Sequence, residues 1–232
     1  RYTQSKYAAM NIRCLVLTTG LSLVILIQFS GQLKASDPLW LRYPSISPDG
    51  SEIVFSYMGD LYRVAAQGGR AVQLTTHAAR DFMPVWSNDG QKIAFASNRY
   101  GNYDVFLIPS VGGAPERLTF HSANDEPYEF TADDNSVYFT SSRRDHHLSS
   151  LFPTGAMPEL YRVALSGGLP EQVLTTPALN MDLAPDSSCF LFEDVKSYED
   201  PFRKHHTSSH ARDIWYCNPD TLEFRKLTDF PG

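Results

Sequence analysis

Basic and histidine side chains gather around two stretches of the sequence, roughly residues 145–158 and 196–210, which hold five of the seven histidines. Guanidinium and ammonium groups bind carboxylates, and a tyrosine can pack on apolar side chains. This combination favours recognition of a peptide at the rim of a fold. The candidate binding residues are Arg143, Arg144, His146, His147, Tyr198, Arg203, Lys204, His205, His206 and His210.

Two other interpretations of these stretches stay open. The first is a metal site, because His206 and His210 are four residues apart. Zinc, however, needs three or four ligands on a fixed backbone, and no helix is evident there. We therefore predict no metal site. The simplest interpretation is that the stretches are solvated loops, or loops that pack against a neighbouring repeat.

Catalytic chemistry has little support in the sequence. Ser208, His210 and Asp213 form a Ser/His/acid set on paper, yet nothing places Ser208 on a strained turn or beside an oxyanion hole. The sequence also has no Gly-rich phosphate loop and no Cys-x-x-Cys pair. We predict no catalytic residue and no cofactor.

The elements that must position these loops are four copies of one sequence unit. Each copy contains a turn with an acidic residue, at Asp49, Asp89, Asp133 and Asp186. A large apolar residue precedes each acid by three positions, and an apolar run begins four positions after it. Identical offsets in all four copies indicate a structural repeat.

Two further elements complete each copy. An acidic residue opens an alternating segment, at Asp60, Asp104, Glu159 and Asp213, and a Leu-Thr pair closes the unit 14 or 15 residues later. Three copies have a Gly pair in between. Because both sets of acids recur in every copy, we expect them to form structural hydrogen bonds to turns and neighbouring backbone.

Each unit predicts four short antiparallel strands, and one such sheet cannot bury both faces alone. The predicted fold is therefore all-β, a β-propeller of four-stranded antiparallel blades with four blades present. The blades span about 40–76, 80–120, 124–176 and 178–228. A β-sandwich with coincidental turn signals is the alternative. The two histidine-rich stretches are insertions after the second strand of the third and fourth blades, so we expect both on one face.

Composition and charge narrow the function classes. The 232 residues are 42% hydrophobic and 20% charged, which is ordinary for a globular chain. All charged residues of 1–35 are basic, namely Arg1, Lys6, Arg13 and Lys34, so the remainder carries a net charge of −10. An acidic domain is a poor candidate for binding phosphates, and we predict no nucleic-acid partner.

The N-terminal segment is typical of a secretory signal peptide. Met10 and Arg13 precede an apolar run over 14–29, and small residues follow. We expect a signal peptide over 10–35, cleaved after Ala35 or Ser36, with residues 1–9 upstream of it. The mature protein would then be periplasmic or secreted, with no stable membrane span. The alternative is an N-terminal membrane anchor, although the run is shorter than the ~20 residues a spanning helix needs.

Cys189 and Cys217 remain after cleavage, in a chain bound for an oxidising compartment. The first blade predicts that Ile53 pairs with Val64, and its register places the two cysteines one residue out of step. A one-residue slip puts side chains on opposite faces of a sheet, although a bulge could restore the pairing. Whether the cysteines form a disulfide stays open.

The four units resemble the repeats of TolB-like propellers and of tricorn-type serine peptidases. The segments Asp37-Pro38-Leu39-Trp40-Leu41-Arg42-Tyr43-Pro44 and His205-His206-Thr207-Ser208-Ser209, with the later Arg212-Asp213-Ile214-Trp215, are similar to the first propeller of secreted bacterial tricorn-type peptidases. The resemblance covers residues 37–232.

This resemblance implies a propeller of six or seven blades followed by a protease core, of which the sequence supplies four blades. The expected function is a non-catalytic propeller segment that helps to admit or guide peptides toward that core. The expected partners are peptides or unfolded protein, bound by the full-length enzyme, and the remaining blades and protease domain of the parent chain. The alternatives are a TolB-like periplasmic scaffold that binds a partner protein, and a propeller hydrolase with acids or histidines around its axis.

Overall fold

A computed structural model describes residues 40–144, 157–186, 188–196, 211–219 and 221–229. All of them belong to one compact unit, Trp40–Gly232. The predicted signal peptide and most of the two insertions lie outside the described residues. In the described part of the chain, no helix reaches the length and hydrophobicity needed to cross a membrane.

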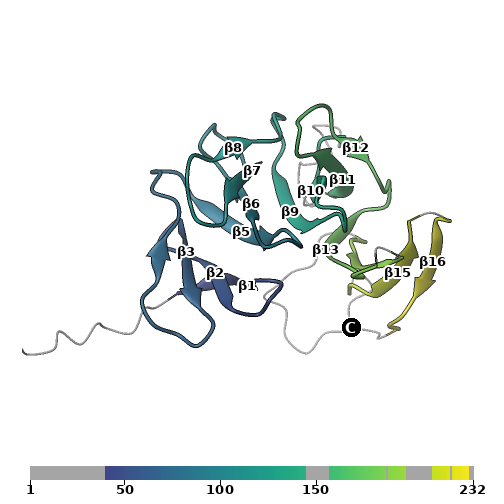
Figure 1. Ribbon diagram of the computed structural model, residues 1–232. Coiled ribbons are helices and arrows are strands. Elements are labelled where there is room, and N and C mark those ends of the chain that lie inside the picture. The colour runs from purple at the N-terminus through teal and green to yellow at the C-terminus, as the bar shows by residue number, and fades with distance from the viewer. Residues whose placement is uncertain (1–39, 145–156, 187, 197–210, 220, 230–232) are drawn as a thin grey trace, which may run out of the picture. The chain divides into compact units, whose positions relative to one another are not determined.

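The described residues form sixteen strands in four antiparallel sheets and no helix (Figure 1). The first sheet contains β1 (Arg42–Ile46), β2 (Glu52–Tyr57), β3 (Asp60–Ala65) and β4 (Val72–Gln73). The second contains β5 (Asp81–Trp86), β6 (Lys92–Ser97), β7 (Asp104–Pro109) and β8 (Glu116–Arg117). The third contains β9 (Asp125–Phe130), β10 (Ser136–Ser141), β11 (Glu159–Ala164) and β12 (Glu171–Gln172). The fourth contains β13 (Ala178–Leu183), β14 (Phe190–Asp194), β15 (Ile214–Asn218) and β16 (Glu223–Lys226).

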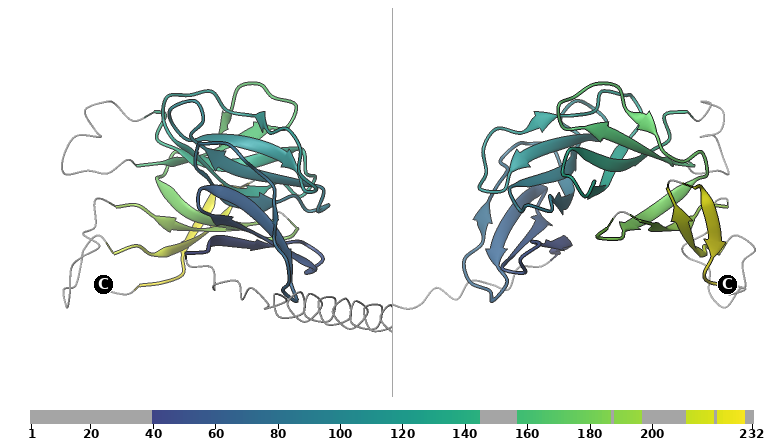
Figure 2. Two further views of the ribbon diagram at one scale, coloured as in Figure 1. Left: turned by 90° about the vertical axis from the view of Figure 1, so that its left-hand side faces the viewer. Right: turned by 45° about the vertical axis from the view of Figure 1, so that its right-hand side comes forward.

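Each sheet follows chain order from its first strand to its fourth, as in a propeller blade. The first strands of successive sheets lie side by side, β1 next to β5, β5 next to β9 and β9 next to β13. Figure 2 shows the sheets following one another along the chain, from blue to yellow. The all-β prediction is confirmed, and the four sheets form an incomplete propeller that does not close.

The turns between the first and second strands explain why the acidic turn motif recurs. Gly50 and Gly90 have φ of +71° and +69°, and Asp134 adopts φ +54° at the same position of the third blade. Gly tolerates this conformation at no steric cost, and Asp is among the few other residues that visit it. A backbone bond from Gly50 N to Ser47 O, 2.8 Å long, closes the first turn.

The core is a series of layers between neighbouring sheets. Val54 and Leu61 of the first sheet pack with Ile93 and Phe95 of the second. A second cluster joins the second and third sheets, and a third cluster joins the third and fourth. Each blade therefore buries its apolar faces against its neighbours, which is why one unit cannot fold alone.

The cysteines are free among the described residues. Ile53 pairs with Val64, as the sequence predicts, and Cys217 pairs with Phe190 rather than with Cys189. Burial raises the pKa of the Cys217 thiol to about 11, which makes it a poor nucleophile.

Candidate functional site

Of the ten predicted binding residues, only Arg143 and Arg144 lie within the described residues. Arg144 is exposed. Arg143 instead places a guanidinium nitrogen 2.7 Å from Asp125 Oδ2, and its guanidinium carbon is 5.0 Å from the ring centroids of Phe139 and Tyr161. The side chain of Arg143 is only 13% exposed and is already paired with Asp125, so little of its guanidinium is left to bind a peptide.

The same arrangement occurs one blade earlier. Arg99 contacts both carboxylate oxygens of Asp81 at 3.1 Å and lies 4.6 Å from the ring centroid of Phe106. Arg99 Nε also donates to Ser97 Oγ, as Arg143 Nε does to Ser141 Oγ. Sequence reasoning missed this recurring pair, although an aromatic residue four positions before each arginine was a usable signal.

The repeated acids at the start of the third strand of each blade bond to nearby side chains, which belong to the fourth strand for Asp60 and Asp104 and to the third strand for Glu159. Asp104 pairs with Arg117 at 2.7 Å, and Asp213 accepts a hydrogen bond from Thr228 at 3.2 Å. The hydroxyl oxygen of the closing threonine also accepts a hydrogen bond from the backbone N–H of the residue after the acid. In the second blade, Val105 N donates to Thr119 Oγ1 at 2.9 Å. The Leu-Thr element of the repeat thus ties the outer strand to its neighbour.

The turn acids lie at the opposite end of the sheets. Asp49 accepts hydrogen bonds from Ser47 Oγ at 2.6 Å and from Ser51 N at 3.0 Å. The same positions around Asp89 and Asp133 repeat this geometry, and Asp186 accepts from Ser188. Each carboxylate bonds to its own turn.

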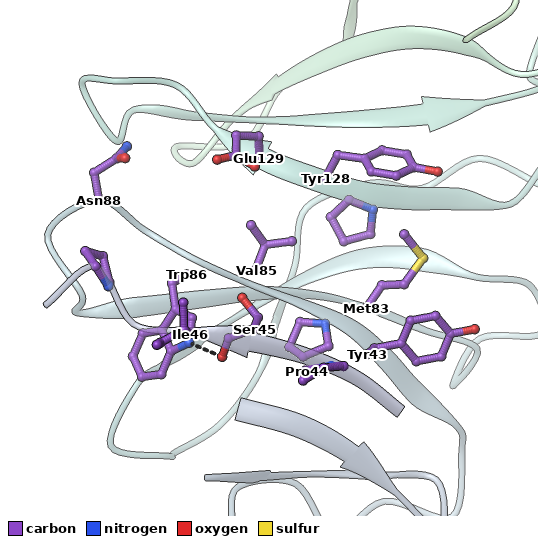
Figure 3. Close-up of a pocket in the computed structure, with 13 residues that line it drawn as sticks. Tyr43, Pro44, Ser45, Ile46, Met83, Val85, Trp86, Asn88, Tyr128 and Glu129 are labelled. Atoms are coloured by element: carbon purple, nitrogen blue, oxygen red, sulfur yellow. Dashed lines mark hydrogen bonds between the residues drawn. The ribbon is translucent and has the colours of Figure 1, made fainter. Parts of the chain in front are cut away.

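A pocket of about 420 Å³, here called the inner pocket, lies along the first strands of three successive blades (Figure 3). Its walls come from β1, β5, β9 and the turns that follow β1 and β5. Its residues are Tyr43, Pro44, Ser45, Ile46, Pro48, Met83, Pro84, Val85, Trp86, Asn88, Pro127, Tyr128 and Glu129.

Backbone bulges shape this wall. Tyr43 of β1 and Met83 of β5 have φ of +52° and +51°, and the pairing of each strand with its neighbour shifts there. Positive φ is rare for residues with large side chains, and bulges redirect side chains next to functional sites. Each is followed by a proline, Pro44 or Pro84, which could have pointed to these positions in the sequence.

Glu129 is the one charged residue that lines the inner pocket, and sequence reasoning missed it. Burial, and to a smaller extent the negative charge of Asp182, raises the pKa of Glu129 to about 7. Among the described residues, the side chains of Glu129 and Asp182 form no ion pair and no hydrogen bond, and Asp182 is exposed on β13. The inner pocket thus holds one uncompensated acid in largely apolar surroundings.

No group of three His, Cys, Asp or Glu side chains that could hold a metal ion occurs within the described ranges. His206 and His210 lie outside them, as do Ser208 and the other predicted histidines.

Comparison with known proteins gives the family context. The family model described as the tricorn protease N-terminal beta propeller domain matches residues 38–232. None of the curated protein sequences compared with the chain matches it.

Three solved structures share the fold. The putative TolB from Agrobacterium tumefaciens is 19% identical with a TM-score of 0.66, over 82% of this chain and 62% of that one. TolB from Acinetobacter baumannii is 17% identical with a TM-score of 0.61, over 82% and 43%. The tricorn protease is 20% identical with a TM-score of 0.65, over 84% and 19%. The chain therefore spans less than two thirds of each of these proteins.

Proposed function

Because the chain belongs to the family of tricorn protease N-terminal β-propeller domains, we propose that it is part of the propeller of a larger tricorn-type serine peptidase. In this proposal it helps to admit or guide peptides toward a protease core and supplies binding surface rather than catalytic groups. The inner pocket supports this role because it lies on the first strands of three blades and is lined by prolines and aromatic side chains.

Exposed apolar side chains on the first and fourth sheets support the presence of further blades in the parent protein. Leu41 is 49% exposed just before β1, and Phe224 is 40% exposed on β16. Large exposed apolar groups on end blades mark surfaces that another element covers. We propose that the remaining blades of the parent chain do so.

A second candidate function rests on the similarity to TolB, whose Agrobacterium structure this chain covers to 62%. In that case the propeller is a scaffold that binds a partner protein and no enzyme is attached. A full-length protein that binds a partner protein but cleaves no peptide would favour this second candidate.

We also propose that the protein is exported, on the basis of the signal-like segment over 10–35. N-terminal sequencing of the protein from the host would then begin at Ser36 or Asp37. A mature N-terminus upstream of Cys14 would contradict cleavage.

The guiding role can be tested by filling the inner pocket in the full-length protein. Ile46→Trp adds bulk at an exposed pocket residue without entering the core, and Val72→Trp adds the same bulk on the outer strand β4. We expect Ile46→Trp to lower kcat/KM for long peptides by about 3- to 10-fold, since remote binding contributes to turnover, and to leave cleavage of di- and tripeptides unchanged. Equal effects of both variants on long peptides would contradict the proposal.

A further inference from the structure

Among the described residues, no cation pairs with Glu129. Arg99 and Arg143, the recurring arginines of the second and third blades, pair instead with Asp81 and Asp125 at the start of β5 and β9. Asp182, on the neighbouring strand β13, adds negative charge rather than compensating it. A partly desolvated carboxylate without a cation is costly unless a ligand supplies one.

Prolines limit the number of backbone N–H donors along the inner pocket, although the hydroxyls of Tyr43, Ser45 and Tyr128 remain among its lining groups. Four of its residues are prolines, including Pro84 and Pro127, and a proline contributes a carbonyl acceptor but no N–H donor. The indole N–H of Trp86 is already used, since it donates to Ser45 O at 3.1 Å (Figure 3). A wall with few free backbone N–H groups binds anions less well than one that presents them, and its carbonyl oxygens favour ligand groups that donate hydrogen bonds.

Apolar surroundings strengthen the attraction between Glu129 and a cation. Val85 and the buried Trp86 form an apolar wall on one side of the pocket. Because an ion pair in low dielectric is stronger than one in water, a single acid there can select for charge. The volume of about 420 Å³ falls within the usual range of ligand pockets, roughly 300–1,000 Å³, and can take one long side chain.

We propose that the inner pocket binds a cationic group of a peptide, with Glu129 as its counter-ion and Asp182 as a second, more exposed negative charge. The group is a lysine or arginine side chain or the α-ammonium of the N-terminus. This inference rests on the proposed peptide-guiding function and specifies which peptides the propeller selects. The aliphatic part of the side chain would pack on Val85 and Ile46.

The test uses the full-length protein and labelled peptides of one length and sequence. One has an acetylated N-terminus and a central lysine, a second has acetyl-lysine in its place, a third has a free N-terminus with acetyl-lysine, and a fourth has glutamate. Binding is measured by fluorescence anisotropy, and mass spectrometry checks that the peptides stay intact. The first and third peptides separate a side-chain cation from the α-ammonium.

We expect at least one of the two cationic peptides to bind about tenfold more tightly than the neutral one, and the glutamate peptide to bind most weakly. Glu129→Gln should remove the difference, and Asp182→Asn should reduce it by about two- to threefold. Glu223→Gln on the exposed strand β16 is the matched control and should change nothing. Unchanged melting temperatures of the variants establish that they fold.

Three results would overturn the inference. Equal binding of all four peptides would refute the charge preference. A lysine preference that survives Glu129→Gln would refute the role of Glu129 as the counter-ion. Both results would leave the peptide-guiding function standing. Absence of binding to every peptide would refute the guiding function as well.

Discussion

At one end of the sheets Asp133 lies in water, where hydrogen bonds from Thr131 and Asn135 hold its pKa at about 2. At the other end Asp104 is fully buried, and desolvation raises its pKa to about 6 despite the nearby Arg117. The repeat places aspartates at both ends of every blade for different purposes. In the turns the carboxylate accepts hydrogen bonds that its charge strengthens. At the buried end of the second and third blades it neutralises an arginine at an electrostatic cost.

The buried end also carries the less satisfied carboxylates. Asp104 Oδ1 and Asp125 Oδ1 have no hydrogen-bond partner within the described part of the chain, although both residues are 0% exposed. The two side chains come from neighbouring blades, and the charge of Asp125 further raises the pKa of Asp104. The ion pairs at this end are therefore the points where one substitution should matter most.

The largest effect is expected from Arg143→Ala. This change leaves Asp125 buried and without its cation, and breaking a buried pair from one side costs about 3–5 kcal/mol of unfolding free energy. Arg162→Ala is the matched control, because its pair with Glu171 is exposed at 40% and 67%. Urea denaturation of the full-length protein, followed by intrinsic fluorescence, should show a small change for the control. Comparable losses in both variants would mean that burial does not make the Arg143–Asp125 pair matter more than an exposed pair.

This comparison also shows how much the sequence could reveal. The offsets around Asp49 and Asp89 predict the turns, the strands and their pairing, because local backbone preferences decide them. The pairing of Arg143 with Asp125 depends on how the ends of two neighbouring strands of a blade come together. A local sequence pattern does not predict such a contact between residues that are distant in the sequence. For this reason the sequence predicts Arg143 as a rim residue and assigns no role to Glu129.

A smaller effect is expected from the titration of Asp104. Its raised pKa means that the folded state binds a proton more tightly than the unfolded state, so this contribution is fully present below about pH 4 and is lost as the pH rises through about 6. Arg117, Arg143 and Asp125 are the charged groups that face it. The loss is on the order of 1–2 kcal/mol, reduced from the full shift because the partly exposed Arg117 admits solvent screening.

Thermal unfolding between pH 4.5 and 7.5 measures this contribution. Asp104→Asn should flatten the fall in melting temperature over this window relative to the unaltered protein. Asp133→Asn should leave the slope unchanged, because Asp133 titrates near pH 2 and outside the window. An unchanged slope in Asp104→Asn would contradict the raised pKa.

Asp134→Ala should weaken the contact between the second and third blades at the turn end. The Asp134 carboxylate accepts hydrogen bonds from Asn88 N at 2.7 Å, from Asn88 Nδ2 at 2.9 Å and from Asp89 N at 2.8 Å. Losing bonds to a charged but exposed acceptor costs about 1–2 kcal/mol. Asp134→Asn keeps one acceptor oxygen and the tolerance for φ +54°, so it should retain part of the stability in the same denaturation assay.

The smallest effect is expected from Asp133→Ala, which removes an acceptor for Thr131 Oγ1 at 2.6 Å and Asn135 N at 3.1 Å. Because water can replace these bonds at an exposed turn, the melting temperature should fall by only a few degrees. The lowered pKa of Asp133 means that its stabilising contribution is present above about pH 4 and is lost as the pH falls toward about 2. The difference between the variant and the unaltered protein should therefore be constant from pH 5 to 7 and shrink below pH 4. A difference that grows on acidification would show that the Asp133 carboxylate does not act as a charged acceptor, and the contrast between the two ends of the blades would fail.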